Sequence, residues 1–252
     1  MVELIAEVSS NHGGDIELAK AFIYAYAEAG ADWVKFQSYQ VATLRPDDPQ
    51  REWLAKAELS DEAHYILKET CEKAGTKFLT TVFHHSRVPF LMGLGLDTLK
   101  IGSGEAGEKT LAETLLMHGL SRVIVSCGLY PPARHAIGWA WAHQRIETRP
   151  SRIDSLHCVS RYPAPVHMAD SDYRTYQGWS DHCVGLDGCT LAYLKGANIL
   201  EKHVSLPEQT REKRSFEATV AEFRALRAFV DDDPKRYVGR WQSQPLTQSA
   251  IA

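Results

Sequence analysis

The stretch Lys195–His203, KGANILEKH, contains the pattern that decides the fold. Gly196 follows a helical segment, at the point where a residue with positive φ is commonly needed to turn the chain into a strand. A short apolar run comes next, and it ends in charged residues, Glu201 to His203. This order of helix, turn, buried strand and polar strand end is typical of a parallel sheet covered by helices.

The same unit recurs along the chain, with similar turns at Gly30, Gly75, Gly95 and Gly119. The strand-like runs are Glu3–Val8, Trp33–Gln37, Lys77–Val82, Thr98–Ile101, Arg122–Ser126, Ile153–Cys158, Gly178–Cys183 and Asn198–His203. The helical patterns are Asp15–Ala29, Asp61–Ala74, His85–Leu94, Glu108–His118, Pro132–Arg145, Ala169–Tyr176, Leu186–Lys195 and Ala218–Val230.

Eight such units ending in a helix predict an α/β fold, a single (β/α)8 TIM barrel. An open doubly wound sheet is the alternative, because the fourth and seventh runs are short. We expect residues 1–233 to form the barrel and residues 234–252 to form a polar C-terminal tail with too little apolar content for another domain. The long segment 38–60 is predicted either to border the mouth of the barrel or to be a surface excursion.

Composition excludes several classes of protein. With 44% hydrophobic residues and a net charge of -4, the chain is typical of a soluble globular protein and offers no polyanion-binding surface, so nucleic acid is not an expected partner.

The first residues lack a basic region and a long apolar run, which predicts a cytoplasmic protein without a membrane span. The 5 cysteines form no CxxC pair and are expected to be buried free thiols, rather than disulfides or zinc ligands, with Cys127 nearest the mouth.

Polar runs end three of the predicted strands: Lys100–Glu105, Ser180–His182 and Glu201–His203. In a parallel barrel the carboxyl ends of the strands meet at one mouth, which is where active sites form. Lys35, Lys100 and Lys202 lie at or near strand ends, where an ammonium group without an anion would lose several kcal/mol of hydration. They therefore predict either a phosphate or carboxylate ligand or internal pairs with Glu7 and Glu105.

Hydroxyl groups follow the same strand ends, at Thr81, Ser103, Ser126 and Ser180, while glycines beside Ser103 allow the backbone to approach a ligand. Together with the lysines they suit a phosphate or carboxylate.

His182 and His203 end consecutive predicted strands. They are predicted either to bind a divalent metal, with Asp181 and Glu201 as orienting groups, or to be hydrogen-bonded core residues.

Taken together, these motifs resemble the sialic acid synthase family, whose members condense phosphoenolpyruvate with an aldehyde sugar to make nonulosonic acids. The resemblance rests on IAEVSSNHGGDIELAK, AGADWVKFQSYQ, FLTTVF, LDTLKIGSGE, VIVSCGL, LHCVSRYPAP, GWSDHCVG and GANILEKH, which cover residue 3 to about residue 223 in order. It implies a cytoplasmic phosphoenolpyruvate-dependent synthase with manganese or magnesium as cofactor. Such barrels commonly dimerise, which makes a homodimer a candidate assembly.

The resemblance also implies roles for individual residues. Phosphoenolpyruvate would be held by Lys35, Thr81, Lys100, Ser103, Ser126, Tyr162 and Ser180, the metal by His182 and His203, and the sugar side would be lined by Glu7, Gln37, Phe83 and Glu105. We assign the catalytic roles to Glu7, Lys35, Lys100 and Glu105, and the remaining non-metal positions to substrate binding.

The chain departs from the family pattern on the sugar side. Ser160 replaces the asparagine of the NxYP motif, and we include it among the substrate-binding residues. Ser215 and Phe216 stand where relatives carry an Asp-His pair, and either Glu212 or Glu217 is a candidate substitute. We also expect the C-terminal antifreeze-like domain of the family to be absent. Three hypotheses remain open: this synthase with an unusual aldehyde, another reaction on phosphoenolpyruvate, or a non-catalytic or partner-dependent barrel.

Overall fold

Eight parallel strands close into a barrel in which each strand pairs with its neighbours in the chain and β8 pairs with β1. The computed structural model describes residues 2–132, 134–137, 152–209 and 212–234. The strands are β1 (Glu3–Glu7), β2 (Trp33–Ser38), β3 (Lys77–Val82), β4 (Thr98–Ile101), β5 (Arg122–Ser126), β6 (Arg152–Cys158), β7 (Gly178–Asp181) and β8 (Ile199–His203). The closed barrel confirms this part of the predicted fold, and the open-sheet alternative is wrong.

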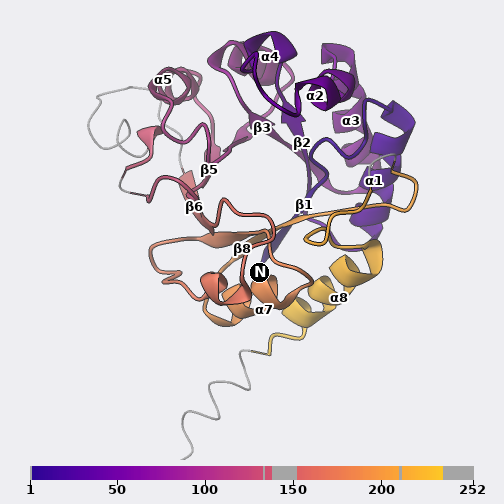
Figure 1. Cartoon of the computed structure of the whole chain (residues 1–252), viewed down its shortest axis with the longest axis vertical. Helices are drawn as coiled ribbons and strands as arrows, with labels where there is room; N and C mark the ends of the chain where they lie inside the picture. Colours follow the sequence, from indigo (N-terminus) through magenta and orange to yellow (C-terminus); the bar gives the residue numbers. More distant parts are fainter. Residues whose placement is uncertain (1, 133, 138–151, 210–211, 235–252) are drawn as a thin grey trace, which may run out of the picture.

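Helices lie outside the barrel, which Figure 1 shows end on with the strands around its centre. They are α1 (Ile16–Glu28), α2 (Arg51–Ala57), α3 (Asp61–Ala74), α4 (Val88–Gly93), α5 (Lys109–Met117), α7 (Asp187–Leu194) and α8 (Val220–Asp231). No helix in the described ranges is both long and apolar enough to cross a membrane.

Local sequence explains where these helices begin and end. Asp15 accepts hydrogen bonds from the first backbone N–H groups of α1, and Thr219 and Glu222 form a capping box at the start of α8. The predicted turn glycines all have positive φ, as at Gly75, where φ is 76° and the N–H group bonds back to the last turn of α3. The αβ turns inferred from the sequence are therefore confirmed.

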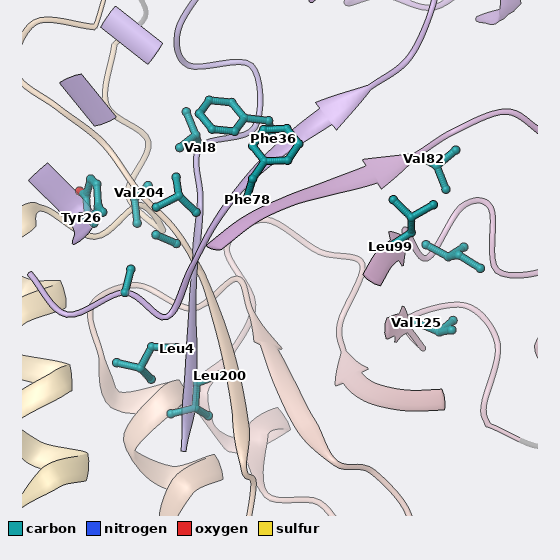
Figure 2. Packing of buried hydrophobic residues seen from close by; sticks show 14 of the residues in the cluster. Leu4, Val8, Tyr26, Phe36, Phe78, Val82, Leu99, Val125, Leu200 and Val204 are labelled. Carbon is teal, nitrogen blue, oxygen red and sulfur yellow. The ribbon is translucent and has the colours of Figure 1, made fainter. Parts of the chain in front are cut away.

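The two faces of the strands have separate apolar layers. Outward residues such as Leu4, Phe36 and Leu200 pack under the helices, as Figure 2 shows, and the rings of Phe36 and Phe78 stack with centroids 5.8 Å apart. Inside the barrel a second cluster fills the centre: Ile5, Trp33, Leu79, Ile124, Leu156 and Ile199.

This inner cluster also fixes which residues reach the mouth. Because side chains alternate along a strand, the residue two positions after each inner apolar residue also points inward, one layer nearer the carboxyl end. Those residues are Glu7, Lys35, Thr81, Ser126, Cys158 and Glu201. The inner apolar cluster, which we call the apolar floor, thus lies beneath a layer of these mostly polar residues.

Three expectations about segments differ from the structure. Ala169–Tyr176 is not an α-helix: a 3-10 turn spans Val166–Ala169, and the Asp172 side chain then bonds the backbone N–H of Arg174, a local bond that competes with helix formation. Segment 38–60 contains the unpredicted helix α2, and the expected helix His85–Leu94 begins with a 3-10 turn before α4. The helix predicted over Pro132–Arg145 falls largely outside the described residues.

The prediction that Lys202 belongs to the mouth is wrong. Lys202 is the register partner of Asp181 on the outer face of β7 and β8, and its Nζ lies 2.7 Å from Asp181 Oδ2 with both side chains fully buried. Lys202 lies between Glu201 and His203, so alternation turns it away from the cavity that they face.

All five cysteines are buried free thiols, as expected, but the thiol at the mouth is Cys158 and not Cys127. Ser126 faces inward, so Cys127 next to it faces the outer layer, where it joins the hydrophobic cluster under the helices.

Replacing Lys202 with Met should lower the free energy of unfolding by roughly 3–5 kcal/mol, because it leaves the Asp181 carboxylate buried without its cation. Urea unfolding measures this, and the double variant Asp181→Asn, Lys202→Met should recover part of the loss. Lys195→Met is the control, since the Lys195–Asp170 ion pair is about half exposed and should contribute less than about 1 kcal/mol. A Lys202→Met protein as stable as the wild type would contradict this account.

Candidate active site

A cavity of about 370 Å³ opens at the carboxyl ends of the strands, above the apolar floor. The structure brings every residue assigned a catalytic, substrate-binding or metal-binding role into its lining: Glu7, Lys35, Gln37, Thr81, Phe83, Lys100, Ser103, Glu105, Ser126, Ser160, Tyr162, Ser180, His182 and His203. Cys158 and Glu201 also line it. The eight strands therefore assemble one cavity from residues that are far apart in the sequence.

Four buried charged side chains alternate in sign at the base of this cavity. Lys35 Nζ lies 2.8 Å from Glu7 Oε2 and 3.6 Å from Glu201 Oε2. Lys100 Nζ lies 3.4 Å from Glu201 Oε2. We call these four residues the charged cluster. Because each ammonium group has a carboxylate within reach, both lysines can remain ionised in the interior.

Hydroxyl groups from neighbouring strands fix the charged cluster in place. Lys35 donates a hydrogen bond of 2.8 Å to Thr81 Oγ1, and Lys100 donates one of 2.6 Å to Ser126 Oγ. Ser180, the register partner of Glu201, donates to its Oε1 over 2.8 Å. Glu201 Oε2, which lies 3.4 Å from Lys100 Nζ and 3.6 Å from Lys35 Nζ, receives no hydrogen bond from the described residues. The polar side chains are held in fixed positions, as a ligand-binding layer requires.

Glu7 and Glu201 differ in the pKa of their carboxyl groups. Burial, only partly offset by the Lys35 ammonium, raises the pKa of Glu7 to about 7. Burial also acts to raise the pKa of Glu201, but the ammonium groups of Lys100 and Lys35 outweigh it and hold that pKa below its ordinary value. Near neutral pH, Glu7 can therefore exchange a proton while Glu201 stays ionised, a separation typical of acid–base sites.

His182 and His203 lie side by side at the rim, with ring centroids 5.3 Å apart. His182 Nδ1 lies 2.7 Å from the carbonyl oxygen of Val159, which makes Nδ1 the donor and leaves the Nε2 lone pair free. Nδ1 of His203 is buried without a hydrogen-bond partner among the described residues. Burial lowers the pKa of both imidazoles, so both are neutral, the form that binds metals.

This pair fits a divalent cation with two protein ligands and open positions for water or substrate. The described residues contain no group of three or more His, Cys, Asp or Glu side chains arranged around a metal position. The fit therefore rests on the orphaned imidazole nitrogen and the neutral rings.

Tyr162 and Ser103 complete the wall. The Tyr162 ring lies against that of His182, with centroids 4.0 Å apart. Ser103 Oγ accepts a hydrogen bond from the N–H of Gly128, where a Cβ would come within 2.8 Å of that oxygen. Glycine at position 128 thus lets the hydroxyl and the backbone meet.

A second hollow of about 580 Å³ lies outside the cavity and shares Gln37, Tyr162 and His203 with it. We call it the outer hollow; its lining is Ser9, Gln37, Gln50, Tyr162, Pro163, His203, Arg214, Ser215 and Phe216. Gln50 comes from segment 38–60, which is docked at the mouth by a hydrogen bond of 2.9 Å from Trp53 Nε1 to Ser10 Oγ. The interpretation of this segment as part of the mouth is confirmed.

Neither of the acidic residues considered as a substitute for the family aspartate lines the cavity. Glu217 is buried and bonded to Arg214, and Glu212 is exposed and lines a different surface pocket. Arg214 lines the outer hollow instead, and sequence reasoning missed it. Glu201 was considered only as an orienting group, although its two-residue spacing from His203 places both on the inner face.

Comparisons with known proteins agree on one family. A sequence profile described as the NeuB family matches residues 22–233. N,N'-diacetyllegionaminic acid synthase of Legionella pneumophila is 34% identical over 232 residues, covering 81% of this chain and 64% of that protein. The Campylobacter jejuni protein of the same name is 32% identical over 230 residues, covering 81% of this chain and 67% of that protein. The chain thus spans about two thirds of the length of these relatives.

Comparison with solved structures also finds a sialic acid synthetase with a similar fold. The crystal structure of N-acetylneuraminic acid (sialic acid) synthetase from Leptospira borgpetersenii, in complex with citrate, has a TM-score of 0.82 and 28% identity, covering 97% of this chain and 87% of that chain. A truncated 3-deoxy-D-arabino-heptulosonate 7-phosphate synthase from Thermotoga maritima, at 13% identity and a TM-score of 0.65, shares the fold alone.

Anion affinity should fall as pH rises through about 7. With Glu7 protonated, two ammonium groups face the single carboxylate of Glu201, whereas ionised Glu7 cancels the surplus positive charge. The expected loss is roughly tenfold or more at a protein-like dielectric constant. Calorimetric titration with sulfate between pH 6 and pH 8 measures it, since the charge of sulfate stays constant there.

The matched control is Glu7→Gln, which should bind sulfate with little pH dependence. Burial lowers the pKa of Lys100 and raises the pKa of Glu105, so a decline that remains in this variant reports on these two residues. The same pH dependence in both proteins would contradict the role given to Glu7.

Proposed function

This chain belongs to the NeuB family, and from that membership we propose that it condenses phosphoenolpyruvate with an aldehyde sugar to give a 2-keto-3-deoxy sugar acid and phosphate. The observation that carries the proposal is the charged cluster: two buried ammonium groups and neighbouring hydroxyls face one cavity. The synthase names of the relatives support it.

Phosphoenolpyruvate carries a phosphate and a carboxylate, and the cavity has donors for both. Lys35 and Lys100 supply the positive charge, while the O–H groups of Ser103 and Ser126, whose oxygens accept hydrogen bonds, can donate to the ligand. Because the lysines are already buried and oriented, an entering anion need not pull them out of water. When Glu7 is protonated, it no longer neutralises the charge of the Lys35 ammonium group, and that positive charge is available to the anion.

The reaction forms a bond between C3 of the enolpyruvate and the aldehyde carbon, adds water at C2 and releases phosphate by C–O cleavage. The aldehyde oxygen gains a proton and the attacking water loses one, so the site needs a group that exchanges protons near neutral pH. Glu7 has the pKa for this role. Glu105, whose pKa is raised by burial, is the second candidate.

We assign a divalent ion, Mn²⁺ or Mg²⁺, to His182 and His203. When bound, such an ion polarises the aldehyde carbonyl. The protein's part is to present neutral imidazoles in fixed orientations: the Val159 carbonyl orients His182, and Tyr162 packs against its ring.

The direct test is phosphate release by the purified protein. Release should require phosphoenolpyruvate, an aldehyde sugar and Mn²⁺ together, and the product mass should equal aldehyde plus pyruvate. Lys100→Met should lower kcat/KM for phosphoenolpyruvate by about a hundredfold or more, because it removes a charged hydrogen-bond donor. Lys195→Met, a substitution on the surface, should leave kcat/KM unchanged.

Chelation should abolish the activity and Mn²⁺ should restore it. Calorimetry separates metal binding from catalysis, because His203→Ala should lose Mn²⁺ affinity. Absence of phosphate release across a broad panel of aldehyde sugars would overturn the proposed function.

A further inference from the structure

Arg214 lines the outer hollow, which adjoins the catalytic cavity. The two share His203, Tyr162 and Gln37, so a ligand with one end beside His203 can extend its other end into the hollow. Arg214 also lines a smaller pocket with Ser10 and residues of segment 38–60. The Arg214 side chain therefore borders two hollows that an acceptor substrate could enter.

Buried polar groups fix the orientation of the Arg214 side chain. Its Nε donates a hydrogen bond of 2.6 Å to Glu217 Oε1, and its Nη2 donates one of 3.2 Å to Asn11 Oδ1. Asn11 is fully buried and its Nδ2 donates to Glu217 Oε1 and to the Val204 carbonyl oxygen. The guanidinium carbon lies 4.8 Å from the centre of the Phe216 ring. A planar donor group held in this way loses little entropy when it binds a ligand.

The partners of Arg214 leave part of its guanidinium group available. Nη1 makes no hydrogen bond to any described residue, and the side chain is 27% exposed. Glu217, by contrast, has no exposed side-chain surface, and both of its oxygens accept hydrogen bonds. The carboxylate thus points into the protein while the cation borders the hollow.

Charge in the outer hollow comes from one side chain. Arg214 is the only Lys, Arg, Asp or Glu among the described residues that line it, while Asp48 lines the smaller adjoining pocket. Gln37, Gln50 and Ser215 add neutral hydrogen-bonding groups. This combination suits a hydroxylated ligand with one anionic group.

We propose that Arg214 selects an aldehyde acceptor that carries an anionic group, a phosphate monoester or a carboxylate, at the end remote from the aldehyde. This inference rests on the proposed function and specifies its acceptor. The guanidinium fork matches the oxygen spacing of both anions, and an anionic acceptor adds a Coulomb attraction to the guanidinium group that a neutral carbonyl lacks.

The kinetic test compares an N-acylated hexosamine with the same sugar bearing a terminal phosphate, and with the corresponding uronate as a separate arm. Wild-type kcat/KM should be about ten- to a hundredfold higher for at least one anionic acceptor. Arg214→Gln should remove this preference through the KM of the acceptor and leave the KM for phosphoenolpyruvate unchanged. The double variant Arg214→Gln, Glu217→Gln guards against misfolding, because it leaves no unpaired buried carboxylate. Arg224→Gln, on exposed α8 surface, is the matched control.

A binding test keeps this inference separate from the proposed reaction. The reduced alditol phosphate lacks an aldehyde and cannot react, so calorimetry with it measures recognition alone. It should bind the wild type more tightly than the neutral alditol, and Arg214→Gln should lose the difference. If no acceptor supports phosphate release but this difference holds, the proposed function fails and anion recognition by Arg214 stands. Equal binding and equal kcat/KM for neutral and anionic ligands would overturn the inference.

Discussion

Glu201 lies between Lys100 and Lys35 inside the barrel, and the arrangement of the mouth depends on these contacts. Two ammonium groups could not stay ionised in so buried a place without a carboxylate near them. Glu201 also accepts a hydrogen bond from Ser180, which connects β7 to the charged cluster. The apolar residues beneath this layer close the barrel, so the charged side chains can extend only toward the opening.

Most of the fold could be predicted from the sequence because strand-like runs, helical patterns and turn glycines are local signals. The inner site could be predicted from the polar strand ends together with the family motifs. A polar residue at a strand end lies near the mouth in any parallel barrel, which is why residues as distant as Glu7 and His203 were assigned to one cavity. The error at Lys202 came from counting charges without applying the two-residue alternation. The error at Ala169–Tyr176 came from an apolar pattern that the local Asp172 hydrogen bond overrides.

The place of Arg214 in the outer hollow could not be predicted from the sequence. Its position depends on Asn11, which is 203 residues away, and on a buried carboxylate that a sequence pattern presents as one more surface charge. Alignment to the family motif drew attention to Ser215 and Phe216, which line the outer hollow, but not to Arg214 beside them. Long-range hydrogen bonds of this kind produce no periodic pattern in the neighbouring sequence.

The two halves of the mouth therefore differ in how they are built. The base of the inner half consists of strand residues whose direction the barrel dictates, and its lysines and hydroxyls suit a small anion. The outer half consists mainly of loop residues held by long-range contacts, where acceptor specificity can change without disturbing the barrel.

The most direct measurement is a crystal structure of the protein with phosphoenolpyruvate. The account predicts that oxygens of the ligand lie within hydrogen-bonding distance of Nζ of both Lys35 and Lys100, above the apolar floor and beside Ser126. A ligand bound elsewhere, with both lysines still paired only to Glu7 and Glu201, would contradict it.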